Sequence, residues 1–359
     1  MKRRIERLQA SLKVESLSAY LITEKYNLRY MSGFTGTNGL ALVTASHAYF
    51  LTDFRYTQQA SKQCEGYEVI LAGGSASTSS PLHILQDIIE KEVLTRIGYE
   101  EQHMTVAEYD GYENFLKAEL VPASGMIEVL RSYKDADEIA KIKQACAITD
   151  KAFDYLLTYL KPGLTEIEVA NTLDFKMREY GASGLSFDTI VASGKRSAMP
   201  HGVASEKRLE KGDIITIDFG CYYQGYASDM TRTVALGDVD PRLKEIHQIV
   251  YEANQLVRDL AKPGMTGQEI DAIARNYIDS HGYGKYFGHA LGHSYGLEVH
   301  EDPNATPSAH TPFEVNQLVT DEPGIYIEGL GGARIEDDLL FIEDGNVCLT
   351  QSPRELILL

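Results

Sequence analysis

Apolar and polar positions change their spacing several times along the first 130 residues, which indicates strands alternating with helices. Short apolar runs rich in β-forming residues predict strands at residues 19–22, 40–43, 49–51 and 69–71. Apolar residues three and four positions apart predict amphipathic helices at residues 82–94 and 106–120. This alternation predicts a self-contained α/β domain.

A polar stretch at residues 131–135 leads into a long helical pattern at residues 137–160. We place a domain boundary at the start of this stretch, which gives a first domain of residues 1–130 and a second of residues 131–359. The length of 359 residues agrees with two domains, because a single core of ordinary size rarely serves so long a chain.

The second domain contains an internal repeat. The sequence KPGLT at residues 161–165 recurs as KPGMT at residues 262–266, and in both copies the threonine begins a helix capping box with a glutamate three residues later. A further matching stretch aligns Asp218 with Glu322. The repeat predicts two related helix-plus-hairpin halves that face each other with these acids between them, in an α+β fold.

Composition narrows the class of function. An apolar fraction of 43% is enough to bury a core, and 52 acidic against 34 basic residues give a formal charge of −18, which disfavours binding to nucleic acid or to anionic lipid. The four cysteines are scattered, as is typical of reduced thiols, and no apolar run is long enough for a signal core or a membrane span. We therefore expect a soluble, cytoplasmic protein.

Two predicted hairpins bring carboxylates together. Asp218 ends one run of β-formers, and in a hairpin folded about Tyr223 and Gln224 it falls roughly opposite Asp229. In the second hairpin Glu322 and Glu336 are equidistant from a glycine-rich loop. Four acids held so close repel one another unless a cation lies between them, so they predict a site for hard divalent metal ions.

A histidine-rich segment lies between the two hairpins. Residues 287–301 contain His289, His293 and His300 among several glycines, which suit a close approach of the backbone to a site. One imidazole from this segment would complete a set of four carboxylates and one histidine.

At these residues the chain resembles the pita-bread metallopeptidases, the family of methionine aminopeptidase, aminopeptidase P and prolidase, and it is closest to the Xaa-Pro-cleaving branch. The resemblance covers the whole chain and implies a creatinase-like N-terminal domain before the pita-bread catalytic domain. By position, Asp218 resembles a terminal metal ligand, Asp229 and Glu336 resemble bridging carboxylates, and His293 and Glu322 resemble ligands of the other metal.

The resemblance also assigns residues around the metals. His201 resembles an outer-shell histidine, and His289 and His300 match histidines that line the substrate pocket and stabilise the charged intermediate. Arg334 and Tyr326 match residues that orient the site. Two positions depart from the family pattern: Ser294 stands where glycine is common, and Asp321 adds a charge beside the site where an apolar residue is common.

The function implied is hydrolysis of the Xaa-Pro bond at the N-terminus of dipeptides or short peptides. The resemblance implies that two divalent cations, best Mn²⁺ with Co²⁺ or Zn²⁺ as alternatives, share a hydroxide that attacks the carbonyl, with Glu322 assisting proton movement. It also implies a homodimer. Two alternatives share the fold: a creatinase-like amidinohydrolase, which needs no metal ligands, and a noncatalytic peptide-binding module, which would be expected to have lost some.

Overall fold

The computed structural model describes residues 2–73 and 79–359, which divide into two compact units, Met1–Arg131 and Ser132–Leu359. No helix in the described ranges is both long and apolar enough to cross a membrane. All four cysteines fall in the described ranges and are free thiols, as their spacing predicts.

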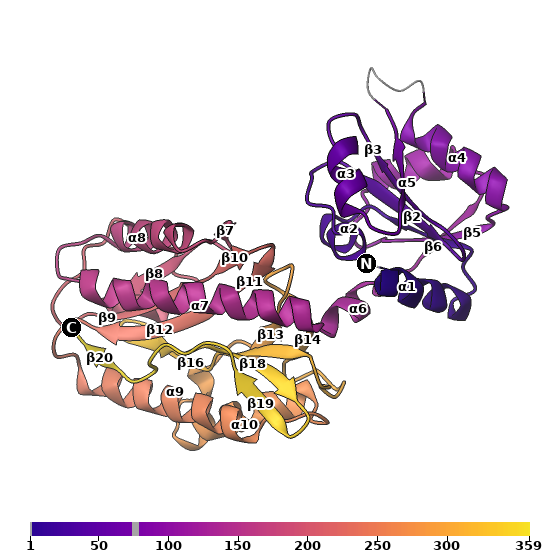
Figure 1. Cartoon of the computed structure of the whole chain (residues 1–359). Helices are drawn as coiled ribbons and strands as arrows, with labels where there is room; N and C mark the ends of the chain where they lie inside the picture. The colour runs from indigo at the N-terminus through magenta and orange to yellow at the C-terminus, as the bar shows by residue number, and fades with distance from the viewer. Residues whose placement is uncertain (1, 74–78) are drawn as a thin grey trace. The chain divides into compact units, whose positions relative to one another are not determined.

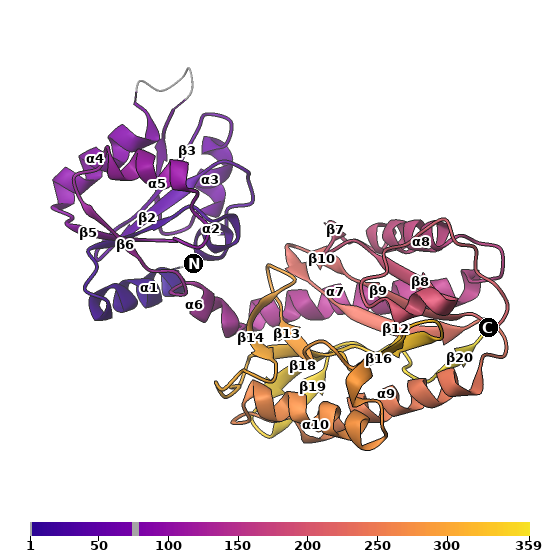
Figure 2. The same ribbon diagram turned by 180° about the vertical axis from the view of Figure 1, so that it is seen from behind.

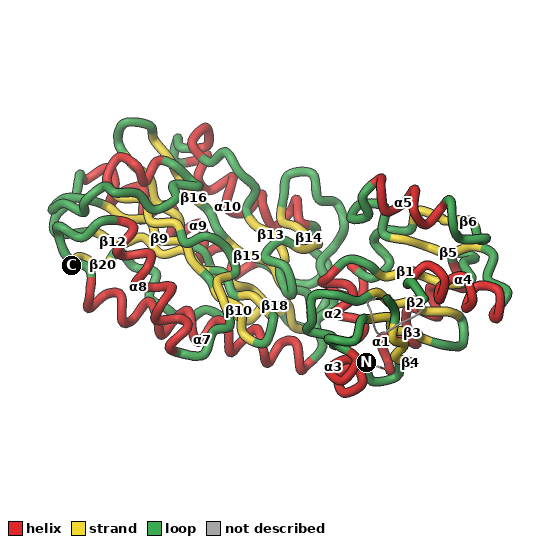
Figure 3. Tube along the Cα trace, turned by 90° about the horizontal axis from the view of Figure 1, so that it is seen from above, coloured by secondary structure: helices red, strands yellow, loops and turns green. Residues whose placement is uncertain are grey.

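The first unit is built on one mixed sheet, whose strand order β4-β3-β2-β1-β5-β6 can be followed through the labels of Figure 3. The three central strands β1, β2 and β3 are antiparallel, and β4, β5 and β6 join them as parallel neighbours. The strands are β1 (Ala19–Ile22), β2 (Leu40–Thr44), β3 (Ala48–Thr52), β4 (Glu68–Leu71), β5 (Arg96–Tyr99) and β6 (Glu119–Pro122). The four strands expected from apolar runs are therefore confirmed.

Helices of this unit are short and amphipathic where they contact the sheet. Leu85, Ile88 and Ile89 of α4 pack into the same core as β1, β3 and β5. The helices are α1 (Lys2–Val14), α2 (Lys25–Ser32), α3 (Thr57–Gln63), α4 (Pro81–Glu92), α5 (Val106–Glu113) and α6 (Glu128–Ser132). The helix expected at residues 82–94 is thus confirmed within two residues.

The helix expected at residues 106–120 is wrong in its second half. Helix α5 ends at Glu113 and buries none of its residues, and the chain then turns to form β6. Leu120 and Val121 pair with β5, so closing the edge of the sheet outweighs the weak helical spacing.

The second unit has two helix pairs that lie on either side of a set of curved sheets (Figures 1 and 2). The first pair is α7 (Ala136–Tyr159) and α8 (Glu166–Glu179), and the second is α9 (Pro241–Leu260) and α10 (Gly267–Ser280). Each pair has its own hydrophobic core, one built with Ile215, Ile217 and Val234 and the other with Val319 and Leu339.

Strands of the first half form the sheet β12-β9-β8, to which the C-terminal β20 adds beside β12, and a smaller sheet, β11-β10-β7. Strands of the second half pair as β15-β18-β19, β16-β17 and β13-β14. Short 3-10 helices span Gly194–Ala198 and Gly284–Tyr286. The bounds are β7 (Gly184–Leu185), β8 (Ile190–Ser193), β9 (Ile214–Phe219), β10 (Cys221–Tyr223), β11 (Tyr226–Ala227), β12 (Met230–Ala235), β13 (Gly292–Ser294), β14 (Glu301–Ala305), β15 (Leu318–Asp321), β16 (Gly324–Ile327), β17 (Gly331–Arg334), β18 (Asp337–Ile342), β19 (Gly345–Cys348) and β20 (Ile357–Leu358).

Backbone contacts at the two KPG segments match, which supports the internal repeat. The capping boxes of Thr165 and Thr266 are both present, at the first turns of α8 and α10. Gly163 N–H donates to Leu209 O at 2.8 Å, and Gly264 N–H donates to Phe313 O at the same distance. The two halves of the second unit therefore begin their second helices in the same way.

Candidate active site

A pocket of about 470 Å³ in the second unit gathers most of the candidate residues. It lies between the two halves, so each half supplies side chains from its own hairpin. Nine candidates line it, and the tenth, Tyr326, is hydrogen-bonded to two of them: the nine are His201, Asp218, Asp229, His289, His293, His300, Glu322, Arg334 and Glu336.

The first hairpin differs from the expected register by one position in its turn. The turn residues are Gln224 (φ 50°) and Gly225 (φ 87°), a left-handed pair that matches strand twist, so Tyr223 faces Tyr226. Asp218 consequently lies opposite Thr231 rather than opposite Asp229. The prediction that the two aspartates face each other is therefore wrong. They are diagonal neighbours instead, because Asp229 and Thr231 lie two residues apart on one strand path.

The second hairpin has the expected symmetry. Asp321 pairs with Asp337 in β15 and β18, and Gly324 pairs with Arg334 in β16 and β17. The same register brings Glu322 and Glu336, which lie between these pairs, opposite each other. Their position at the break between two strand pairs turns both carboxylates into the pocket.

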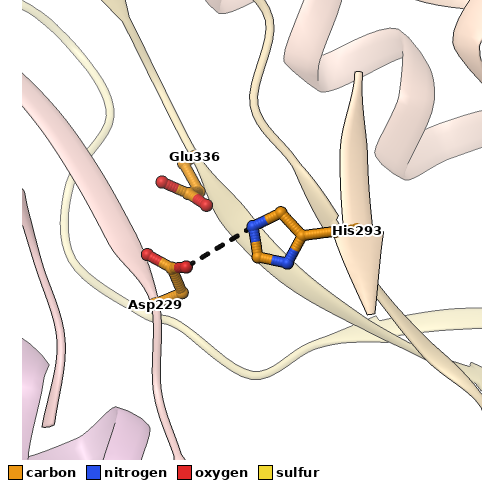
Figure 4. A group of neighbouring side chains, drawn as sticks. All are labelled: Asp229, His293 and Glu336. Carbon is orange, nitrogen blue, oxygen red and sulfur yellow. Dashed lines mark ion pairs between the residues drawn. The ribbon is translucent and has the colours of Figure 1, made fainter. Parts of the chain in front are cut away.

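Asp229, His293 and Glu336 form the tightest cluster, and Figure 4 shows their polar atoms pointing toward one another. One ligand atom from each lies within 4.8 Å of the others. The His293 Nε2 atom is 3.7 Å from Asp229 Oδ2 and 3.5 Å from Glu322 Oε1. These separations leave room for a cation between the atoms.

Local hydrogen bonds fix the ring of His293 for ligation. Its Nδ1 lies 3.1 Å from Ser294 O, which can only accept, so Nδ1 carries the proton and Nε2 presents a lone pair to the acids. Burial lowers the pKa of His293 to about 4, which keeps the ring neutral. A neutral imidazole facing carboxylates gains no ion pair, but it is a good metal ligand.

Burial makes the four carboxylates costly to ionise. Burial, followed by the charge of Glu336, raises the pKa of Asp229 well above its usual range, and burial raises the pKa of Glu322 to about 7. Burial, then Glu322, likewise raises the pKa of Glu336, and burial raises that of Asp218. A divalent cation would reverse this cost.

Arg334 and Thr231 hold the carboxylates in place. The Arg334 guanidinium donates to Asp218 Oδ2 at 2.6 Å and to Thr231 Oγ1 at 3.0 Å, and Thr231 Oγ1 donates to Glu336 Oε2 at 2.6 Å. The other Asp218 oxygen, Oδ1, is buried and has no hydrogen-bond partner among the described residues. That orphaned atom fits a metal ligand, and Arg334 pairs with Asp218 rather than with Glu336 or its neighbours.

Tyr326 and His289 continue this network. Arg334 Nη1 donates to the Tyr326 hydroxyl at 2.9 Å, and the hydroxyl lies 3.0 Å from His289 Nε2. His289 Nδ1 lies 2.7 Å from Ala290 O, so both ring nitrogens have protein partners. Burial lowers the pKa of His289 to about 4, and it also lowers the pKa of His300, whose ring lies 4.4 Å from that of His293.

Asp321 does not add its charge to the pocket as expected. Its side chain accepts from Asn254 Nδ2 at 3.0 Å, on the opposite face of the strand from Glu322. Nearby, Arg232 and Arg258 pair with the cross-strand Asp337 at 2.8 and 3.1 Å. The second departure, Ser294, accepts a hydrogen bond from the buried amine of Lys134 at 3.2 Å.

Some residues that support the site lack a strong sequence signal. Thr231 and Thr320 lie two positions from Asp229 and Glu322, so strand alternation could have found them. Thr320 Oγ1 accepts from the His293 N–H at 3.0 Å and donates to Glu322 at 3.1 Å. Lys134 could not have been found, because it is distant in sequence from both of its partners, Ser294 and Glu301.

Comparisons with known proteins agree with this geometry. Residues 140–343 match Metallopeptidase family M24, and residues 4–133 match the Creatinase/Prolidase N-terminal domain. The chain therefore belongs to metallopeptidase family M24, with a creatinase-type N-terminal domain and a pita-bread catalytic domain.

Similar proteins match over nearly their full lengths. An uncharacterized peptidase of Bacillus subtilis is 48% identical over 357 residues, 99% of this chain and 100% of that protein. The structure of an Xaa-Pro dipeptidase from Bacillus anthracis has a TM-score of 0.97 at 46% identity, covering 100% of this chain and 99% of that one. An X-Pro aminopeptidase from Thermotoga maritima has a TM-score of 0.91 at 38% identity, covering 98% and 100%. The expected family and fold are thus confirmed.

Proposed function

We propose that the protein is a dinuclear-metal exopeptidase that hydrolyses the bond between an N-terminal residue and proline in dipeptides or short peptides. The observation that carries the proposal is the convergence of five candidate ligands, Asp218, Asp229, His293, Glu322 and Glu336, on one pocket. The relatives named Xaa-Pro dipeptidase and X-Pro aminopeptidase supply the substrate class.

The residues present fit a pair of divalent cations. Four carboxylates with raised pKa values and one neutral imidazole form an oxygen-rich donor set, which favours Mn²⁺ among the common ions, with Co²⁺ or Zn²⁺ as alternatives. When bound, two such cations supply Lewis acidity and a water of lowered pKa.

The chain's own residues bind the substrate and move protons. Glu322 is our candidate for accepting and returning the proton of the attacking water. His300 and His201 line the pocket and are the candidates for donating to the charged transition state. His289 has both nitrogens engaged, so we assign it to holding the Tyr326 hydroxyl, which Arg334 fixes from the other side.

The test is hydrolysis of a matched pair, an Xaa-Pro dipeptide and the same sequence extended by one residue, with Mn²⁺ added and then chelated. We expect cleavage that is lost on chelation and that falls about 10³-fold in Asp229→Ala, as for other losses of transition-state charge stabilisation. Cleavage of the dipeptide alone defines a prolidase, and cleavage of the longer peptide defines an aminopeptidase P.

The matched control is Asp238→Ala, an acid outside the pocket lining. It should leave cleavage unchanged. If the purified protein neither contains nor binds a divalent metal, and Asp229→Ala cleaves peptides as well as the wild type does, the proposal fails and the peptide-binding or amidinohydrolase alternatives return. Sedimentation of the same sample tests the proposed homodimer.

A further inference from the structure

Asp188 is a charged residue of the pocket that the chemistry above does not use. It lines the same cavity as the candidate metal ligands, yet it is exposed. Among the described residues it has neither a hydrogen bond nor an ion pair. An acid in this position is open to an incoming ligand.

Asp188 lies two residues before β8, in a stretch of chain that borders the pocket. The next residue, Thr189, donates to Asp174 Oδ1 at 2.6 Å and does not line the cavity, whereas Phe187, Asp188 and Ile190 do. Asp174 adds a second carboxylate behind Asp188, and the charge of Asp188 contributes to raising the pKa of Asp174 after burial, the larger cause. Arg178 acts on Asp174 in the opposite direction, so Asp174 has a cation near it, and Asp188 is the carboxylate here that has no hydrogen bond or ion pair among the described residues.

The rest of the pocket does not cancel that charge. Two divalent cations and Arg334 would together balance the four ligand carboxylates and the hydroxide that the cations share, and Arg334 is paired with Asp218 at 2.6 Å. Asp188 then remains as a carboxylate of the lining that has no partner among the described residues. Of the groups in an Xaa-Pro dipeptide, proline carries no cation and its terminal carboxylate is repelled, so a cation at Asp188 must belong to Xaa.

Spacing distinguishes the two cations that Xaa can carry. Ile190 pairs directly with Asp218 across β8 and β9. An extended chain rises about 3.3 Å per residue, so Asp188, two residues before the start of β8, lies about 7 Å along the chain from that pair. The α-ammonium is two bonds from the reacting carbonyl carbon and must stay near the metal ligands, whereas a lysine or arginine side chain spans such a distance.

We propose that Asp188 is a specificity residue that binds the side-chain cation of Xaa, so that the enzyme favours lysine or arginine before proline. This inference rests on the proposed function and adds a substrate preference to it. A pair between a carboxylate and an ammonium in a solvated site is worth about fivefold in binding.

The test compares Lys-Pro with norleucine-Pro, which has the same carbon chain without the ammonium, and with Glu-Pro. In Asp188→Asn we expect the ratio of kcat/KM for Lys-Pro over norleucine-Pro to fall about fivefold, chiefly through KM. Asp188→Lys should lower the ratio further and raise cleavage of Glu-Pro. Asp238→Asn removes a charge outside the pocket and should keep the wild-type ratio. The melting temperature of each variant verifies its fold.

Each other outcome overturns the inference. If both dipeptides are cleaved and the ratio stays within twofold of the wild type in Asp188→Asn, Asp188 does not read the side chain. An equal fall for both dipeptides would assign it to the α-ammonium instead. If the wild type cleaves none of the three dipeptides, the proposed function itself fails, and this inference with it.

Discussion

The two halves of the catalytic unit share a backbone plan but differ in the side chains that they bring to the pocket. Each has a helix pair whose second helix begins with a Thr-Glu capping box, followed by a hairpin that carries two acids. The first half gives Asp218 and Asp229, and the second gives two glutamates together with His293 and Arg334. The repeat therefore gives the two halves the same backbone arrangement, and the side chains that differ between them supply the different groups of the site.

The residues just before the first helix of each half, α7 and α9, also differ in chemistry although the backbone plan is shared. Helices α7 and α9 have aspartate N-caps, Asp135 and Asp240. The residue before the first cap is Lys134, whose buried amine lies 3.2 Å from Glu301 Oε2, whereas the residue before the second cap is the buried Val239. Glu301 in turn accepts from two N–H groups of the loop between His293 and His300. The start of the first half thus braces the histidines of the second.

Lys134→Met breaks this bracing and has the largest expected effect. It removes the Lys134 ammonium from the buried Glu301 carboxylate, so the free energy of unfolding should fall by about 3–5 kcal/mol. Urea denaturation at pH 7 measures the change. The matched control is Lys141→Met, whose partner Asp137 is exposed, and it should cost less than about 0.5 kcal/mol. Equal effects in the two variants would show that the buried pair has no special role.

Asp218 and Glu322 occupy equivalent positions in the repeat, and neutral variants should separate them. Asp218→Asn removes the charged partner of Arg334 and should destabilise the chelator-treated protein by about 2–3 kcal/mol. Glu322→Gln removes a carboxylate whose pKa is already raised to about 7, so it should be neutral or stabilising. Thermal melting in chelator measures both variants. An equal change in melting temperature for Asp218→Asn and Glu322→Gln would contradict the expected difference between the two positions.

The smallest expected effect concerns a second position at which the two halves differ, seven residues after the N-caps of α7 and α9. Helix α7 has the buried Ile142 there, whereas α9 has the buried His247, and burial lowers the pKa of His247 from 6.5 to about 4. The unfolded chain then binds a proton that the folded chain does not, so stability falls as the pH drops from about 6.5 toward 4.

This residue alone should cost about 2 kcal/mol at pH 5 relative to pH 7. His247→Gln should reduce the loss of stability between pH 7 and pH 5 by that amount. His281→Gln, at an exposed histidine, is the control. An identical pH dependence in the wild type and His247→Gln would show that His247 does not titrate differently on folding.

Much of the site could be predicted because strands alternate and turns have signatures. The opposition of Glu322 and Glu336 follows from counting about Gly329, and the observed register agrees. The same counting is wrong at Asp218 because it centres the turn on Tyr223 and Gln224, whereas the left-handed pair that forms the turn is Gln224 and Gly225. A one-residue shift of a turn moves the opposite partner by two, which keeps the face and changes the neighbour.

Other features could not be predicted from local patterns at all. Helix α5 stops at Glu113, and the chain beyond it forms β6, which pairs with β5 on the other side of this helix in the sequence. The sequence places Asp321 as a charge beside the site, but its side chain lies on the other face of the strand, where Asn254 on α9 donates a hydrogen bond to it. In each case a partner far along the chain decides the outcome, and a single sequence does not show such pairs.

The Arg334 guanidinium has a consequence for the order of events in the life of the protein. Since it lies 2.6 Å from Asp218 within the acid nest, the folding chain carries one positive charge of its own to that place. We therefore expect the chain to reach its folded state before it binds metal. The supply of ions, as well as ligand chemistry, would then decide which divalent ion the folded protein binds.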